Sequence, residues 1–120
     1  MQAPLLVEEY RFGWIKIGGR PYTRDIVFTP AGILDDAWWR REGHVLYWED
    51  LEPYIREAAP SVVIVGTGHD GMLKIDYTVV EALRELGVEL LAAPTREAVD
   101  VYNRLAEEGA RVLAALHLTC

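Results

Sequence analysis

The sequence predicts one small α/β domain, residues 1–120, in which a β-hairpin precedes alternating strands and helices. Three observations support this fold class. Ser61–Val65 is a continuous, mostly β-branched run, which is typical of a strand buried on both faces. Two later segments carry apolar residues at helical spacing, and each ends at a glycine. No repeat, low-complexity tract or linker-like stretch divides the chain.

Composition narrows the class of protein. The chain has 120 residues, 51% hydrophobic and 26% charged, which suits a globular domain rather than a disordered one. Its net charge of −7 argues against a nucleic-acid partner, because binding phosphates requires clustered Lys and Arg. We find no secretory signal and no apolar run of the roughly 18 residues that span a bilayer. We therefore expect a cytoplasmic protein with no membrane partner; its oligomeric state is left open.

The first third of the chain predicts the hairpin. Tyr10–Ile17 and Tyr22–Phe28 have strand composition, and the intervening Gly18–Pro21 is a strong turn signal. Within the second strand, Arg24 and Asp25 are expected to form an exposed pair.

The segment after the hairpin is less regular. Residues 35–43 suit either a short helical turn or an irregular loop, whereas His44–Trp48 has strand composition. Asp50 is predicted to cap a helix whose apolar residues recur at spacings of three and four until Pro60 ends it.

The remaining elements alternate. A helix is predicted over Asp76–Leu86 and ends at a glycine, a strand over Val88–Ala92, a helix beginning near Thr95, and a final strand over Arg111–Leu116. Short links between them imply right-handed crossovers and a largely parallel sheet.

The best candidate site is the glycine-rich loop Gly66–Gly71, which follows the buried strand. Ligands of open α/β sheets bind beyond the carboxyl ends of strands, and glycines can expose backbone N–H groups to an anion. Thr67 adds a hydroxyl and His69 a group that titrates near neutral pH, whereas Asp70 would repel an anion. The glycine spacing matches no phosphate fingerprint. A purely structural turn, a ligand contact and a catalytic loop therefore all remain open. The candidate residues of the loop are Gly66, Thr67, Gly68, His69 and Asp70.

Three further residues join this candidate ligand-binding set. Thr95 is expected to be a helix N-cap, and that helix N-terminus would face the same strand ends as the loop. Arg96 could supply a positive group there. Asn103 lies within the helix, where it either bonds a neighbouring loop or is exposed.

No catalytic set, metal site or cofactor is predicted. His44, His69, His117 and Cys120 show no ligand spacing along the chain, and a single cysteine allows no internal disulfide. Trp38 and Trp39 are adjacent, so both cannot point the same way in an extended segment. One of them can lie on the surface and mark a contact patch.

The segments Val63–Gly68, Leu90–Val99 and Ala114–Cys120, together with Tyr102 and Asn103, resemble a family of small domains of unknown function. Its eukaryotic members include mitochondrial complex I assembly factor three and an adipogenesis-associated protein. The resemblance covers nearly the whole chain. It implies a three-layer α/β domain with a mixed, partly parallel central sheet, helices on its faces and an N-terminal β-hairpin. One strand, with the last as a candidate, would run antiparallel. It implies no catalytic residues.

Two functions follow as hypotheses. The first is a non-enzymatic, protein-binding or assembly-type domain that uses the strand-end cleft and exposed aromatic side chains. The alternative is a small-molecule or anion-binding domain, or a weak enzyme, built on the glycine-rich loop.

Overall fold

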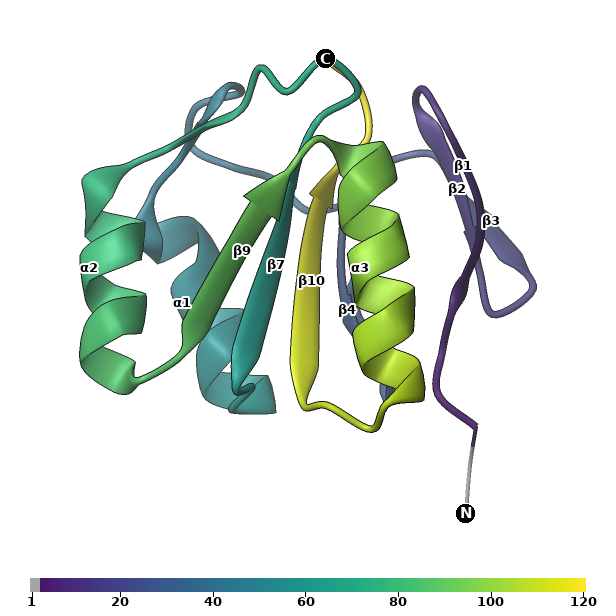
Figure 1. Ribbon diagram of the computed structural model, residues 1–120. Coiled ribbons are helices and arrows are strands. Elements are labelled where there is room, and N and C mark those ends of the chain that lie inside the picture. Colours follow the sequence, from purple (N-terminus) through teal and green to yellow (C-terminus); the bar gives the residue numbers. More distant parts are fainter. Residues whose placement is uncertain (1–2) are drawn as a thin grey trace.

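The central sheet of this computed structural model, which describes residues 3–120, is mixed (Figure 1). Strands β10 (Val112–His117), β7 (Val62–Thr67) and β9 (Glu89–Ala93) run parallel. Strand β4 (Ile26–Thr29) runs antiparallel to β10, and β5 (Gly32–Asp35) runs antiparallel to β4. The last strand, β10, was the candidate for an antiparallel strand, but it runs parallel to its neighbour β7. The antiparallel pairings involve β4 and β5, which come from the first third of the chain. In spatial order the strands are β5, β4, β10, β7 and β9.

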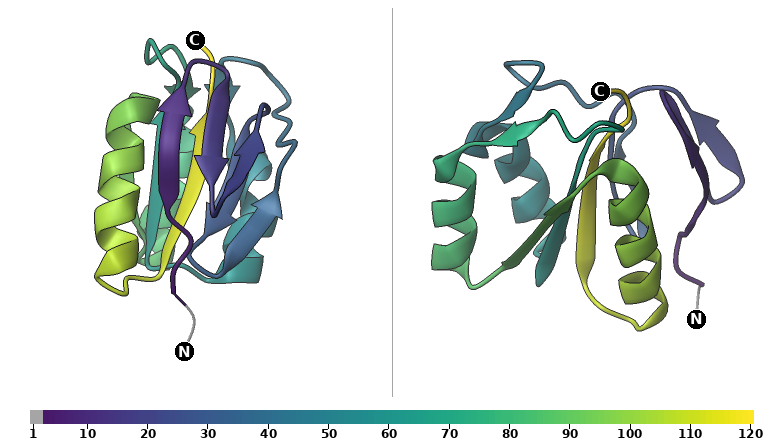
Figure 2. Two further views of the ribbon diagram at one scale, coloured as in Figure 1. Left: turned by 90° about the vertical axis from the view of Figure 1, so that its right-hand side faces the viewer. Right: turned by 45° about the horizontal axis from the view of Figure 1, so that its top comes forward.

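The two faces of this sheet are covered differently. Helices α1 (Trp48–Ala58) and α2 (Tyr77–Leu86) cover one face. Helix α3 (Thr95–Glu107) and a small antiparallel sheet cover the other (Figures 1 and 2). The small sheet consists of β1 (Val7–Arg11), β2 (Trp14–Ile17) and β3 (Arg20–Tyr22). The three-layer fold with a mixed sheet and an N-terminal hairpin is thus confirmed.

Side-chain alternation along the buried strands explains these layers. In β7, Ile64 faces α3 and the small sheet, whereas Val63 and Val65 face α1 and α2. In β10, Leu116 faces α3 and the small sheet, whereas Leu113 faces α1 and α2. Because both faces are apolar, β7 and β10 read as continuous hydrophobic runs.

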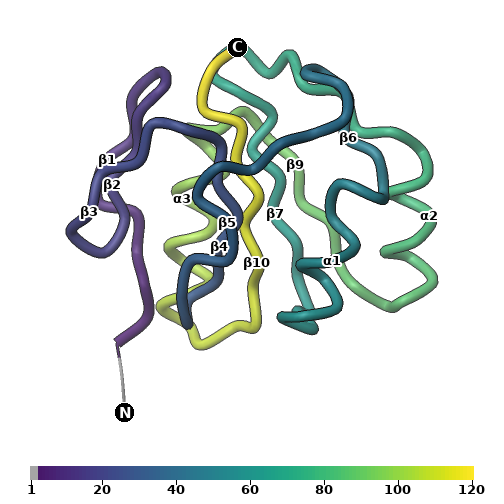
Figure 3. Tube along the Cα trace, turned by 180° about the vertical axis from the view of Figure 1, so that it is seen from behind, coloured from purple at the N-terminus to yellow at the C-terminus, as the bar shows by residue number. Residues whose placement is uncertain are grey.

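The opening strands are divided more finely than the sequence predicts. Gly13 adopts φ +72°, so a tight turn splits the expected strand Tyr10–Ile17 into β1 and β2. The expected strand Tyr22–Phe28 is interrupted before Ile26, and its second half leaves the hairpin to become β4 of the central sheet (Figure 3).

The predicted strand His44–Trp48 is reduced to β6 (Val45–Leu46), which pairs with a short strand that the sequence does not predict, β8 (Lys74–Ile75). Helix α1 begins earlier than expected, and Asp50 caps it from inside, by accepting a hydrogen bond from the Tyr47 N–H. Within residues 3–120, no helix is long and apolar enough to cross a membrane.

Candidate functional site

The glycine-rich loop Gly66–Gly71 lies where β7 ends, against the segment that follows β10. Three of its amides donate within the protein. Gly68 N–H bonds Thr95 Oγ1 at 2.9 Å, and His69 N–H bonds the Thr119 carbonyl at 2.6 Å. Gly71 N–H bonds the Gly68 carbonyl at 3.2 Å. These three amides therefore bond other groups of the protein and do not face an anion.

The loop requires glycine because two chain segments approach each other closely. A Cβ added to Gly68, whose φ is +105°, would lie 2.5 Å from the Cys120 carbonyl oxygen. One added to Gly66 would lie 2.8 Å from Thr95 Oγ1. Thr67 is half-buried, whereas His69 and Asp70 are exposed, with His69 Nδ1 3.4 Å from the Tyr10 hydroxyl.

Thr95 is fully buried and is the first residue of α3; Pro94 occupies the N-cap position, so the predicted capping role is wrong. The Thr95 hydroxyl accepts from Gly68 N–H and donates to the His117 carbonyl at 2.6 Å. A single hydroxyl thus joins the loop, the helix and the last strand.

Arg96 and Asn103 line a different groove, between α3 and β1. The Arg96 guanidinium lies 5.5 Å from the centre of the Tyr10 ring. Asn103 is a structural anchor: its Oδ1 accepts from Val7 N–H and its Nδ2 donates to the Val7 carbonyl, each at 2.8 Å. The predicted set therefore divides into a loop with Thr95 and a separate pair on α3.

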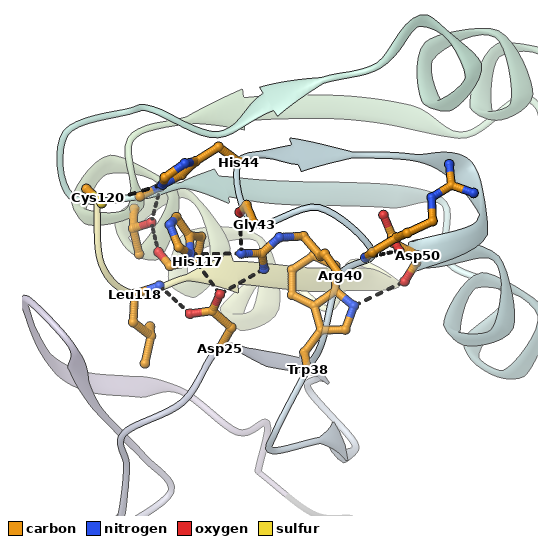
Figure 4. Close-up of polar contacts among 12 residues, drawn as sticks. Asp25, Trp38, Arg40, Gly43, His44, Asp50, His117, Leu118 and Cys120 are labelled. Carbon is orange, nitrogen blue, oxygen red and sulfur yellow. Dashed lines mark hydrogen bonds and ion pairs between the residues drawn. The ribbon is translucent and has the colours of Figure 1, made fainter.

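A second polar cluster lies at the same end of the sheet and centres on Asp25 (Figure 4). Its carboxylate accepts from His117 Nδ1 at 2.7 Å, from an Arg40 guanidinium nitrogen at 2.8 Å and from Leu118 N–H at 2.8 Å. The Asp25 side chain is 15% exposed, so the expected exposed Arg24–Asp25 pair is wrong.

Burial raises the pKa of the Asp25 carboxyl. The hydrogen bonds from His117, Leu118 and Arg40 outweigh it and hold the pKa below its usual range. Asp25 is therefore a largely buried anion at neutral pH. Arg40 supplies the compensating charge, and its second terminal nitrogen donates to the Gly43 carbonyl at 2.9 Å.

The cluster also orients His117. Two groups contact His117 Nδ1: the Asp25 carboxylate at 2.7 Å, which can only accept, and an Arg40 guanidinium nitrogen at 3.1 Å, which can only donate. The shorter Asp25 contact favours the tautomer with its proton on Nδ1. His117 Nε2 is then an acceptor, and it has no hydrogen-bond partner among the described residues. The Arg40 Nε–H, a donor, also has no partner among them. His44 and Cys120 lie next to this ring (Figure 4).

A groove of about 580 Å³ opens beside this cluster. Trp38 is buried and its Nε1–H donates to the Asp50 carbonyl at 3.1 Å, whereas Trp39 is 87% exposed. The adjacent tryptophans thus point in different directions, as expected for such a pair. The groove is lined by Arg24, Asp25, Ala37, Trp38, Trp39, Arg40, Arg41 and Gly43.

The sequence alone does not predict that Asp25, Arg40 and His117 form one cluster. Two signals were present: Asp25 directly precedes the buried run Ile26–Phe28, and His117 interrupts an otherwise apolar final strand. Nothing in the local pattern indicates that the two meet.

A three-layer α/β domain with a buried carboxylate–histidine–arginine cluster at its strand ends is the class of protein that these features define. Residues 7–117 match the family described as "Protein of unknown function (DUF498/DUF598)", and the chain belongs to this family.

Solved structures of similar proteins share the fold. A conserved hypothetical protein of Pyrococcus horikoshii OT3 is 34% identical, with 95% of this chain and 98% of that one covered and a TM-score of 0.79. A Bordetella parapertussis protein is 30% identical, with 98% of each chain covered and a TM-score of 0.81. A Bordetella pertussis protein, described as a Mth938-like domain, is 25% identical over 95% of this chain and 85% of that one, with a TM-score of 0.77.

The close approach at Gly68 predicts a difference between two glycine substitutions in the loop. Gly71 also has positive φ, +68°, but a Cβ there would meet nothing nearer than 3.7 Å. We expect Gly71→Ala to cost about 1 kcal/mol from backbone strain, and Gly68→Ala about 4 kcal/mol from strain plus overpacking. Urea unfolding followed by circular dichroism measures both. Equal costs would show that contact with Thr119 and Cys120 is unimportant.

The two hydrogen bonds to Val7 predict a structural role for Asn103. We expect Asn103→Ala to lower the free energy of unfolding by about 1–3 kcal/mol, because it leaves the Val7 backbone groups without their partner. Amide exchange at Val7 should accelerate at the same time. Asp100→Asn, at an exposed position of the same helix, is the matched control. Unchanged stability and exchange in Asn103→Ala would contradict the anchoring role.

Proposed function

We propose that this protein is a non-enzymatic protein-binding domain, and that it takes an acidic segment of a partner protein in the groove beside Trp39. One observation carries the proposal: an almost fully exposed tryptophan stands among arginines on a chain whose net charge is −7. Tryptophan and arginine are among the residues most enriched at the energetic centres of protein interfaces.

The charges in the groove favour an acidic partner. Arg40 is neutralised by Asp25, and exposed Arg41 lies 3.5 Å from Glu49. Arg24 is exposed and forms no ion pair within residues 3–120. A carboxylate of a partner would therefore meet Arg24 without first displacing an internal partner, and its approach would be steered by local positive charge.

The loop that carries Trp39 is fixed by hydrogen bonds of the residues on either side of Trp39. Trp38 N–H donates to the Asp25 carbonyl at 2.8 Å, and Arg40 is bound by Asp25 and Gly43. A side chain presented on a fixed backbone loses less conformational entropy on binding than one on a mobile loop. This support favours a preformed contact surface.

We prefer this groove to the glycine-rich loop, because the Gly68, His69 and Gly71 amides of that loop already donate within the protein. An assembly-type role would use a partner-binding surface of the same kind.

Selection of peptides from a random displayed library against the full chain tests the proposal. We expect enrichment of peptides rich in Asp and Glu. Their affinity should fall at least about tenfold in Trp39→Ala, because exposed anchors of this kind dominate binding energy. Arg24→Glu should weaken binding further at low salt, since it reverses the local charge.

Tyr77→Ala is the matched control, because Tyr77 is a 70% exposed aromatic residue on α2, outside the groove. It should leave affinity unchanged. A library without acidic enrichment, or selected peptides that bind Trp39→Ala and wild type equally, would refute the groove as the binding site.

A further inference from the structure

We propose that His44, His117 and Cys120 bind a zinc ion, in a site built from separate parts of the chain. This proposal does not depend on the peptide groove. A nitrogen of each histidine and the Cys120 Sγ lie within 4.8 Å of one another. Imidazole nitrogen and thiolate sulfur are the ligands that Zn²⁺ takes most often in proteins.

His117 is the fixed member of the site. It is 6% exposed, and Asp25 holds its Nδ1–H at 2.7 Å. Nε2 is thereby left as a buried lone pair with no partner among the described residues. A carboxylate that orients a histidine through its other nitrogen is the usual outer partner of a zinc ligand, because it fixes both the tautomer and the ring.

His44 and Cys120 already stand at the separation that zinc requires. His44 Nε2 lies 3.6 Å from Cys120 Sγ. Bond lengths of about 2.3 Å to sulfur and about 2.0 Å to nitrogen, at tetrahedral angles, place the two ligand atoms about 3.5 Å apart. The three ligand atoms lie within 4.8 Å of one another, so the farthest pair closes by up to about 1 Å on binding. This adjustment falls on His44 and Cys120, since His44 is exposed and Cys120 is only half-buried.

The surrounding charges permit a cation. Arg40 is the nearest positive group, 3.1 Å from His117 Nδ1, but Asp25 neutralises it at 2.8 Å. On binding, the Cys120 thiol releases its proton to solvent and ligates as the thiolate, while His44 and His117 ligate as neutral rings. Three protein ligands leave the fourth tetrahedral position open to water or to an incoming group.

Titration of the reduced full chain with Zn²⁺ and with Co²⁺ tests the site. We expect one equivalent of either ion to bind, and Co²⁺ to show a thiolate charge-transfer absorption band. Zn²⁺ should also raise the melting temperature of the wild type, as any ligand that binds the folded state does.

His44→Ala and Cys120→Ala should each weaken zinc binding by about 100-fold or more, because removal of even an outer partner costs about 10–100-fold. Both positions lie outside the apolar core, so these variants are expected to fold. His69→Ala is the matched control, since His69 is exposed and lies beside Tyr10 and Phe12 instead. It should bind zinc like the wild type.

Absence of saturable binding, cobalt bound without the thiolate band, or affinity unchanged in His44→Ala and Cys120→Ala would each overturn the proposal. None of these measurements uses a peptide, so a negative result would refute the zinc site without bearing on peptide binding in the groove. Zinc binding that is lost in His69→Ala as well as in Cys120→Ala would place the metal elsewhere and would equally refute this site.

Discussion

The pairing of β10 between β4 and β7 is the constraint from which the polar end of the molecule follows. Ile26 of β4 stands opposite Leu116 of β10, and the two strands are antiparallel. Asp25, one residue before Ile26, is therefore brought beside His117, one residue after Leu116. The register between β4 and β10 is fixed by the apolar residues on both faces of the sheet. This register places Asp25, which precedes β4, next to His117, which ends β10.

Once Asp25 is buried, its charge requires compensation. An unpaired carboxylate inside a protein is costly, and Arg40 reaches it from a segment with little regular structure. This ion pair and the hydrogen bonds of Trp38 and Gly43 help to fix the segment that carries Trp39 and His44. Both proposed functions thus depend on one buried carboxylate, although they use different side chains around it.

The glycine-rich loop illustrates how one sequence pattern serves two purposes. Glycines after a buried strand are typical of anion-binding loops, but here they allow the chain that follows β10 to pass within contact distance of the end of β7. The buried hydroxyl of Thr95 completes this junction by bonding Gly68 and His117. The loop is therefore best understood as a junction between strand ends, which brings Cys120 to the side of His44.

Elements with strong local signals were determined by the sequence alone. The β-branched run of β7, the apolar stripes of α2 and α3 and the glycine that ends α2 each depend on residues a few positions apart. Local physics also placed the turn between β2 and β3. Only the tertiary structure decided the strand order, the break at Asp25 and the short pairing of β6 with β8. Only the tertiary structure also brought Asp25 to His117, which are 92 positions apart in the sequence. A buried charge is paired with whichever group lies near it in the folded chain, and no local spacing in the sequence encodes that proximity.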